Sequence, residues 1–336
     1  MRLLKALLWF IGGLALVFIG GSFLLPSSVR FERSILIDRA PSLVFPILNS
    51  WQRFNEWSPW AAIDPNATYE YSGPTSGVGA KMRWSGNEAV GQGGQEILLS
   101  QPDTALDVQL DFGDMGQPLT TWRLSPEGEG TRAIWSFEAK FGADPVQRWF
   151  GLLTERFVGP DYERGLSQLK TLVESLPKAD LAGRDIAIVE TQARPIAFIS
   201  TRSSPDVAAI GAAYAAAYAT IGEALAAAGL NQAGPPIGID TRYDAEVYEF
   251  DAAIPVDRSD VVLTEPVQLG VTDAGRAVRV RHVGSYDGLD AATTAGQAYL
   301  ALHQLKPRAR VYTEFVSDPG QTPEAELISD IYFPIE

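Results

Sequence analysis

The chain has 336 residues, with 27 lysines and arginines against 41 aspartates and glutamates, and its formal net charge is −14. This charge argues against a nucleic-acid partner, because phosphates demand a basic binding face. Cysteine is absent, which excludes disulfides, thiol nucleophiles and thiolate metal sites. The two histidines, His282 and His303, lack the spacing of a helical ligand pair, so neither a metal site nor a cofactor is predicted.

A membrane anchor is predicted at the N-terminus. Residues 6–25 carry no charge and are followed by Pro26, and as a helix they are long enough to cross a hydrocarbon core of about 30 Å. The alternative is a cleaved signal peptide, whose apolar region should be shorter and should end in an Ala-x-Ala-like site. That site is missing here, so residues 1–28 are predicted to form a single-pass transmembrane anchor.

The flanking charges predict the orientation of this anchor. Arg2 and Lys5 precede the apolar run, which by the positive-inside rule places the N-terminus in the cytoplasm. Arg30 and Arg33 follow the run closely and weaken this asymmetry. We therefore expect a protein of a bacterial-type inner membrane, with its soluble body in the periplasm or otherwise outside the cytoplasm.

Two domains are predicted beyond the anchor, because the remaining chain is longer than one hydrophobic core usually serves. All eight tryptophans precede residue 150, whereas residues 207–228 form an alanine-rich helical stretch. The polar residues 177–193 are predicted to be a linker. The expected domains are therefore residues 29–176 and residues 194–336.

The first domain is predicted to contain one sheet and two helices. Residues 31–38 alternate apolar and polar side chains like a half-buried strand, and residues 41–48 are typical of a short helix. Residues 145–176 repeat apolar side chains at helical spacing, with a kink expected at Gly159-Pro160. Further strands are expected at 67–71, 80–84, 95–100, 105–112, 120–125 and 131–139. This order predicts an α+β half-barrel closed by a long helix.

Several motifs of this domain resemble those of one known family. They are Trp57-Ser58-Pro59-Trp60, Gly77-Val78-Gly79-Ala80, Trp84-Ser85-Gly86-Asn87 and Gly159-Pro160-Asp161-Tyr162-Glu163. Over residues 29–175 the chain is similar to the polyketide cyclase/dehydrase-like branch of the START (SRPBCC) superfamily. The resemblance implies a helix-grip fold, in which a sheet wraps the closing helix around a deep apolar cavity. Known members bind lipids, polyketides, sterols or hormones, and only some catalyse reactions.

Five residues are candidates for lining such a cavity, because they alternate with polar neighbours along the predicted strands and so share one face. They are Met82, Trp84, Phe112, Trp122 and Trp135. The alternative is that they only fill the core, as large apolar side chains usually do. No nucleophile, base and orienting group can be assembled from the sequence, so no catalytic residue is predicted.

A repeated unit organises the second domain. Each copy reads strand, helix, strand, strand, and ends near an Ile-Pro or Phe-Pro pair. The first copy comprises 196–202, 207–228, 237–241 and 247–256, and the second comprises 277–282, 288–303, 310–315 and 328–335. Two such units predict a pseudo-twofold α+β fold in which each half packs against the other.

The second copy resembles the gyrase-inhibitor-like, or effector-binding, domain. Its motifs are His282-Val283-Gly284-Ser285-Tyr286, Val311-Tyr312-Thr313-Glu314-Phe315 and Asp330-Ile331-Tyr332-Phe333-Pro334-Ile335. The resemblance implies a groove between the repeats for small ligands, often cationic or aromatic. The implied contacts are Glu314, Tyr312 and Phe315, with Tyr248 as the counterpart in the first repeat. A carboxylate flanked by rings attracts cations. The alternative is that Glu314 faces solvent.

These features predict a membrane-anchored protein that captures or sequesters hydrophobic or amphipathic small molecules, including cationic ones, in two pockets. Its expected partners are that ligand and, through the N-terminal helix, the membrane. One alternative is a cyclase or hydrolase acting within one pocket, for which Glu314 and Tyr312 are the residues to test. Another is a non-catalytic envelope scaffold with filled cavities. Pocket volume separates a scaffold from a binding protein, because only the binding protein keeps unfilled space.

Overall fold

The computed structural model describes residues 2–336, with side chains from Leu4 onward. Met1 and the side chain of Arg2, both part of the predicted anchor, lie outside the described residues. The chain divides after Leu176 into two compact units. The first unit begins with helix α1 (Arg2–Ser22), whose residues 4–20 are exposed. Leu4–Ser22 has a mean hydropathy of 1.9, enough to span a membrane, although a signal sequence passes the same test.

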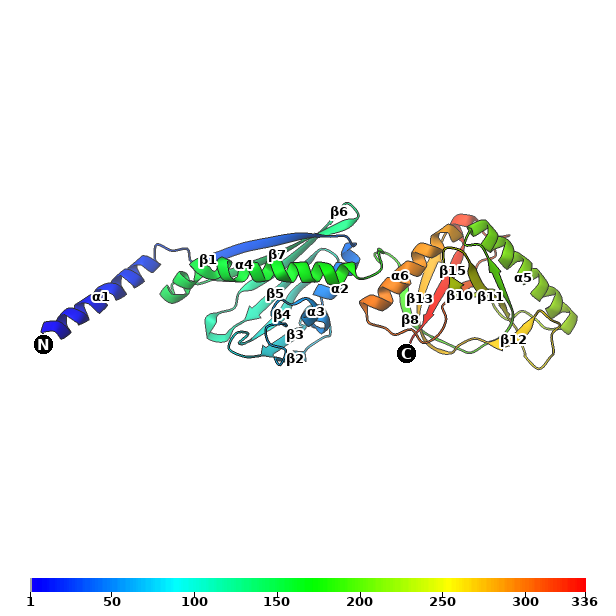
Figure 1. Cartoon of the computed structure of the whole chain (residues 1–336), viewed down its shortest axis with the longest axis horizontal. Coiled ribbons are helices and arrows are strands. Elements are labelled where there is room, and N and C mark those ends of the chain that lie inside the picture. The colour runs from blue at the N-terminus through cyan, green and yellow to red at the C-terminus, as the bar shows by residue number, and fades with distance from the viewer. Residues whose placement is uncertain (1) are drawn as a thin grey trace. The chain divides into compact units, whose positions relative to one another are not determined.

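A seven-stranded antiparallel sheet forms the body of the first unit (Figure 1). Its strand order is β1-β7-β6-β5-β4-β3-β2, so the first strand pairs with the last. The strands are β1 (Ser28–Ile37), β2 (Thr68–Ser72), β3 (Lys81–Ser85), β4 (Gln92–Gln101), β5 (Ala105–Asp111), β6 (Leu119–Glu127) and β7 (Gly130–Lys140). Because side chains alternate between faces, Thr120, Trp122 and Leu124 of β6 are all buried on one side.

Helix α4 (Pro145–Glu174) packs along β1 on the buried face of this sheet. Asp144 caps it, because its Oδ1 accepts hydrogen bonds from the backbone N–H groups of Val146 and Gln147. The buried stripe of α4 consists of Tyr162, Leu166, Leu169 and Val173, at helical spacing. The chain stays helical through Gly159 and Pro160. Two short helices, α2 (Pro41–Leu48) and α3 (Phe54–Trp57), complete the wall around the core.

The second unit contains an eight-stranded sheet in the order β12-β9-β11-β10-β14-β15-β13-β8. Its strands are β8 (Asp185–Thr191), β9 (Pro195–Ser203), β10 (Ile237–Tyr243), β11 (Tyr248–Pro255), β12 (Gln268–Val271), β13 (Gly275–Val283), β14 (Tyr312–Phe315) and β15 (Ile328–Pro334). Helix α5 (Val207–Ala228) packs on β9 and β11, and α6 (Leu289–Leu302) packs on β13 and β15 (Figure 1). The prediction of an α+β domain with two related halves is confirmed. The two halves meet where β10 pairs with β14.

Each half of this sheet receives its edge strand from the other half. Strand β8 precedes the first repeat in the chain but pairs with β13 of the second, while β12 precedes the second repeat but pairs with β9 of the first. The stretch expected to be a linker, residues 177–193, therefore contains a strand. The four residues Ile186, Ala187, Ile188 and Val189 are all apolar, so both faces of this strand carry apolar side chains. Polar residues precede and follow this short run, which is why the sequence predicted a linker.

Candidate functional site

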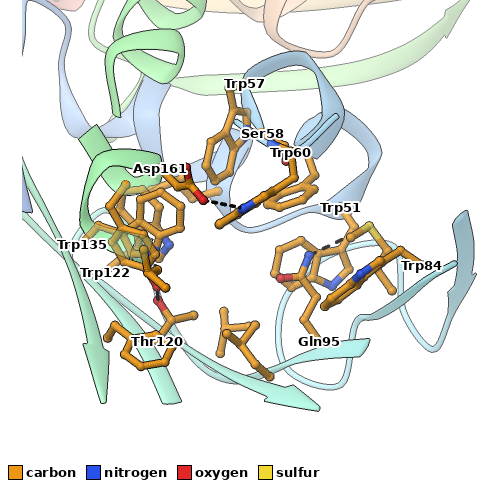
Figure 2. A pocket seen from close by; sticks show the side chains of 18 of the residues that line it. Trp51, Trp57, Ser58, Trp60, Trp84, Gln95, Thr120, Trp122, Trp135 and Asp161 are labelled. Atoms are coloured by element: carbon orange, nitrogen blue, oxygen red, sulfur yellow. Dashed lines mark hydrogen bonds between the residues drawn. The ribbon is translucent and has the colours of Figure 1, made fainter. Parts of the chain in front are cut away.

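The first domain encloses a cavity of about 230 Å³ between the sheet, α3 and α4 (Figure 2). A cavity of this size suits a compact ring system or part of an acyl chain. The five residues chosen from strand alternation all line it: Met82, Trp84, Phe112, Trp122 and Trp135. Met82, Trp122 and Trp135 are buried, so they belong to the core of the domain and also line the cavity. Contact with a ligand stays a prediction.

One wall of the cavity is a stack of aromatic rings held by a single hydroxyl. The Trp135 ring stacks between Trp122, at 4.6 Å between centroids, and Tyr162 of α4, at 3.8 Å. Thr120 Oγ1 accepts a hydrogen bond from Trp135 Nε1 at 2.7 Å, donates to the Ser136 carbonyl at 2.8 Å and lies 3.1 Å from Tyr162 Oη. Burial raises the pKa of Tyr162 well above its usual value, so the phenol stays protonated.

The polar groups on the other side of the cavity are few. Gln95 extends from β4 toward the interior (Figure 2), and its amide nitrogen lies 3.9 Å from Met82 Sδ. Trp57 is buried, and its Nε1–H has no hydrogen-bond partner among the described residues. Trp60 Nε1 donates to Asp161 Oδ2 at 3.0 Å. An unpaired buried N–H is costly, so Trp57 Nε1 is a polar group of this wall that the described residues leave unsatisfied.

Several lining residues are only half-buried. They include Trp60 in the loop after α3, Trp84 of β3, Phe112 after β5, and Val158 and Asp161 of α4. Asp161 is the one carboxylate in the described lining, and it is already bound by Arg164 and Trp60. The other ionisable side chains of the described lining are Tyr69 and Tyr162.

In the second domain the predicted contacts lie on opposite faces of the sheet. Tyr248 packs with Phe250 against α5, and Phe315 contacts Tyr214 of α5 at 5.4 Å between ring centroids. Tyr312 and Glu314 point to the other face, because neighbouring strand residues alternate. The structure therefore groups Tyr248 with Phe315, and Tyr312 with Glu314.

Glu314 is buried, with 9% of its surface exposed, and does not face solvent. Its cationic partner is Arg194 of the same chain. Tyr312 stacks on Tyr332 at 4.8 Å between centroids, and burial, with Glu314 nearby, raises the pKa of Tyr332 to about 12. On this face two further carboxylates are also paired with arginines, Asp330 with Arg281 and Asp251 with Arg310. The cation that Glu314 was expected to attract is thus supplied internally.

A different acid, Asp240, lies on the helix-covered face of the sheet and has no arginine partner among the described residues. Asp240 of β10 accepts a hydrogen bond from Tyr248 Oη at 2.6 Å, and Tyr248 Oη lies 3.1 Å from Tyr214 Oη. Asp240 forms no ion pair among the described residues, and burial raises its pKa while the Tyr248 hydrogen bond opposes that rise. Ring contacts link Tyr214 through Phe315 to Tyr286 of the second repeat. This aromatic cluster around Asp240 was missed, because Asp240-Thr241-Arg242-Tyr243-Asp244 is typical of a turn.

A shallow depression of about 590 Å³ lies over β9, β10 and β11 of the same domain. Asp251 occupies it and is bound by Ser200 Oγ at 2.6 Å and by Arg310 Nη1 at 2.7 Å. None of the four predicted contacts of this domain lines it.

Comparisons with known proteins agree with this architecture. Residues 28–174 match the family described as polyketide cyclase / dehydrase and lipid transport, and residues 184–336 match the GyrI-like small molecule binding domain family. No curated protein matches the chain. The EcmrR C-terminal domain is similar to 46% of this chain over 98% of its own length, with 19% identity and a TM-score of 0.41.

Two further solved structures are similar to about half of the chain. Ara h 8.0201 covers 44% of it over 99% of its own length, with 15% identity and a TM-score of 0.35. A hydrolase from Listeria innocua covers 46% over 92% of its own length, with 14% identity and a TM-score of 0.34. Behind an apolar N-terminal helix, the chain is therefore a polyketide cyclase (SRPBCC) domain followed by a GyrI-like small-molecule-binding domain.

Proposed function

We propose that this protein is a membrane-anchored carrier that captures hydrophobic or amphipathic small molecules. The observation that carries the proposal is the aromatic cavity of about 230 Å³ in the first domain, which the side chains around it leave unfilled. Its lining has one bound carboxylate and a few neutral polar groups, which suits an apolar ligand with a hydrogen-bonding atom. A scaffold needs no such space, because protein interiors normally pack to crystal-like density.

Helix α1 supports the membrane part of this proposal. Its length and hydropathy fit a span, and the positive-inside rule places the two domains outside the cytoplasm. Arg33, which weakened that assignment, forms ion pairs with Glu155 at 3.2 Å and Glu163 at 2.8 Å. Its guanidinium is therefore held against α4, while the exposed Arg30 remains a positive charge on the far side of α1.

The cavity can be tested with a neutral fluorophore such as 1-aminonaphthalene. Energy transfer from the lining tryptophans to the bound probe should appear on titration and saturate. Val108 is fully buried in the cavity wall, so Val108→Trp should place an indole in the space and abolish the signal. Leu98→Trp is the matched control, because Leu98 is exposed and lies outside the lining. Equal binding by both variants, or none by the parent, would contradict the proposal.

A second ligand class is favoured by the Asp240 cluster. Among the described residues Asp240 is a half-buried carboxylate that forms no ion pair, and it is bonded to Tyr248, which joins Tyr214 and Phe315 in one cluster of rings, so the site suits an aromatic cation. Benzyltrimethylammonium is a suitable probe. Its affinity should fall on Asp240→Asn and stay unchanged on Glu314→Gln, whose parent carboxylate is occupied by Arg194. The reverse result would assign the cation to Glu314 instead.

A further inference from the structure

The first half of α4 carries an exposed apolar stripe. Its members are Val146 (63% exposed), Trp149 (37%), Phe150 (66%), Leu153 (43%) and Phe157 (60%). Successive members are one, three or four residues apart, which places them along one side of the helix. We call these five residues the docking stripe. Contiguous exposed apolar surface on a soluble protein usually marks a surface that binds a partner or a membrane.

The docking stripe begins where α1 ends. Trp149 Nε1 donates a hydrogen bond to the Phe18 carbonyl at 3.0 Å, and the two rings stack at 5.8 Å between centroids. Arg148 Nη1 donates to the Ser22 carbonyl at 3.2 Å. The Phe141 N–H, just before α4, donates to the Ser27 carbonyl at 2.8 Å. These contacts hold the start of α4 beside the point at which the chain leaves α1.

We propose that the docking stripe lies in the lipid interface of the same membrane that holds α1, an inference that rests on the anchoring role proposed above. Trp149 is of the residue type enriched at membrane interfaces. Arg148 lies over the Phe23 ring, at 5.6 Å, and its guanidinium also donates to the Gly142 carbonyl, so it fixes the start of α4 against the end of α1. Because the chain carries a net charge of −14, burial of apolar side chains rather than attraction to anionic lipid drives the contact.

A docking stripe in the lipid interface would place part of the cavity lining near the lipid. Phe157, the last member of the docking stripe, directly precedes Val158, which lines the cavity. Asp161, one turn further along α4, also lines it, and both residues are half-buried. Docking of the stripe therefore brings this part of the cavity lining close to the bilayer surface. The ligand of the cavity is a molecule that dissolves in the lipid phase and enters the protein without crossing bulk water.

Cysteine labelling of the full chain tests the inference, because the native chain has no cysteine. Phe150→Cys and Phe157→Cys would each carry a nitrobenzoxadiazole label, in phosphatidylcholine vesicles that contain a spin-labelled lipid. Gln168→Cys is the matched control, since Gln168 is exposed on α4 about 16 Å beyond Phe157 at about 1.5 Å per residue. Leu14→Cys, in α1, reports whether the anchor inserts.

We expect the lipid quencher to act several-fold more strongly on labels at 150 and 157 than at 168, and equally at low and high salt. If the label at 14 is quenched while those at 150 and 157 behave like the control, docking is refuted and the anchor stands. If the label at 14 is also unquenched, both fail. Energy transfer between labels at 150 without lipid quenching would identify a second copy as the occupant and would also refute the inference.

Discussion

Removing the hydroxyl of Thr120 is the sharpest test of how the cavity wall is held. Thr120→Val keeps the shape of the side chain but leaves Trp135 Nε1–H and Tyr162 Oη without their partner. All three residues are at most 4% exposed. Each stranded buried group costs about 1–3 kcal/mol, and the added methyl returns about 0.8 kcal/mol. For the two stranded groups together, the expected loss in the free energy of unfolding is therefore about 1–5 kcal/mol.

Tryptophan emission is the appropriate readout, because all eight tryptophans precede residue 150 and the second domain has none. Urea titration of the full chain followed by this signal reports the first domain alone. Thr121→Val is the matched control, since Thr121 lies on the other face of β6, and it should change stability by less than about 0.5 kcal/mol.

A double-mutant cycle separates the hydroxyl network from packing. Tyr162→Phe alone should cost about 1 kcal/mol, but it should be neutral or stabilising in the Thr120→Val background, where the phenol is already stranded. Additive effects would refute the network. A loss below about 1 kcal/mol for Thr120→Val would mean that water in the cavity satisfies both groups, so that neither is stranded.

Two further predictions concern the second domain, and hydrogen exchange of its sheet measures both. A Cβ at Gly296 would lie 2.1 Å from Phe333 Cε2, so Gly296→Ala should destabilise the domain by about 1–3 kcal/mol. Gly222 has open space around it, so Gly222→Ala should stabilise the domain by about 1 kcal/mol. A stabilising Gly296→Ala would contradict this prediction. Burial raises the pKa of Asp240, so between the two pKa values the native state keeps a proton that the unfolded chain has lost. The free energy of unfolding should therefore fall as pH rises from the ordinary aspartate pKa of about 3.9 through the raised value. Asp240→Asn should remove this fall, and an unchanged pH profile would refute it.

Local patterns predicted the frame of the first domain and part of its site. Period-two alternation in β3, β6 and β7 was enough to select Met82, Trp122 and Trp135, because strand side chains on one face share one environment. Tyr162 and Trp57 could not be selected in the same way. They reach the cavity from helices, and the face of a helix that meets a sheet depends on tertiary packing.

The second domain shows where strand patterns alone fall short. Glu314 and Phe315 are adjacent in β14, so alternation alone required them to face opposite sides. Grouping Tyr248 with Phe315 needed the register between strands, which a shift between Asp240 and Arg242 alters. Asp240 itself has the local sequence of a turn, and only its placement under Tyr214 and Tyr248 distinguishes it from a solvated carboxylate.

The exchanged edge strands limit where this protein can be divided. A fragment that begins at residue 194 would lose β8 and leave β13 with a row of unpaired backbone N–H and C=O groups. Such an open edge recruits strands from other molecules, so the fragment would be prone to aggregate. A fragment that begins near residue 180 keeps β8 and with it the native edge of the sheet. The solubility of the isolated second domain thus depends on the residues of β8, which lie in the stretch predicted to be a linker.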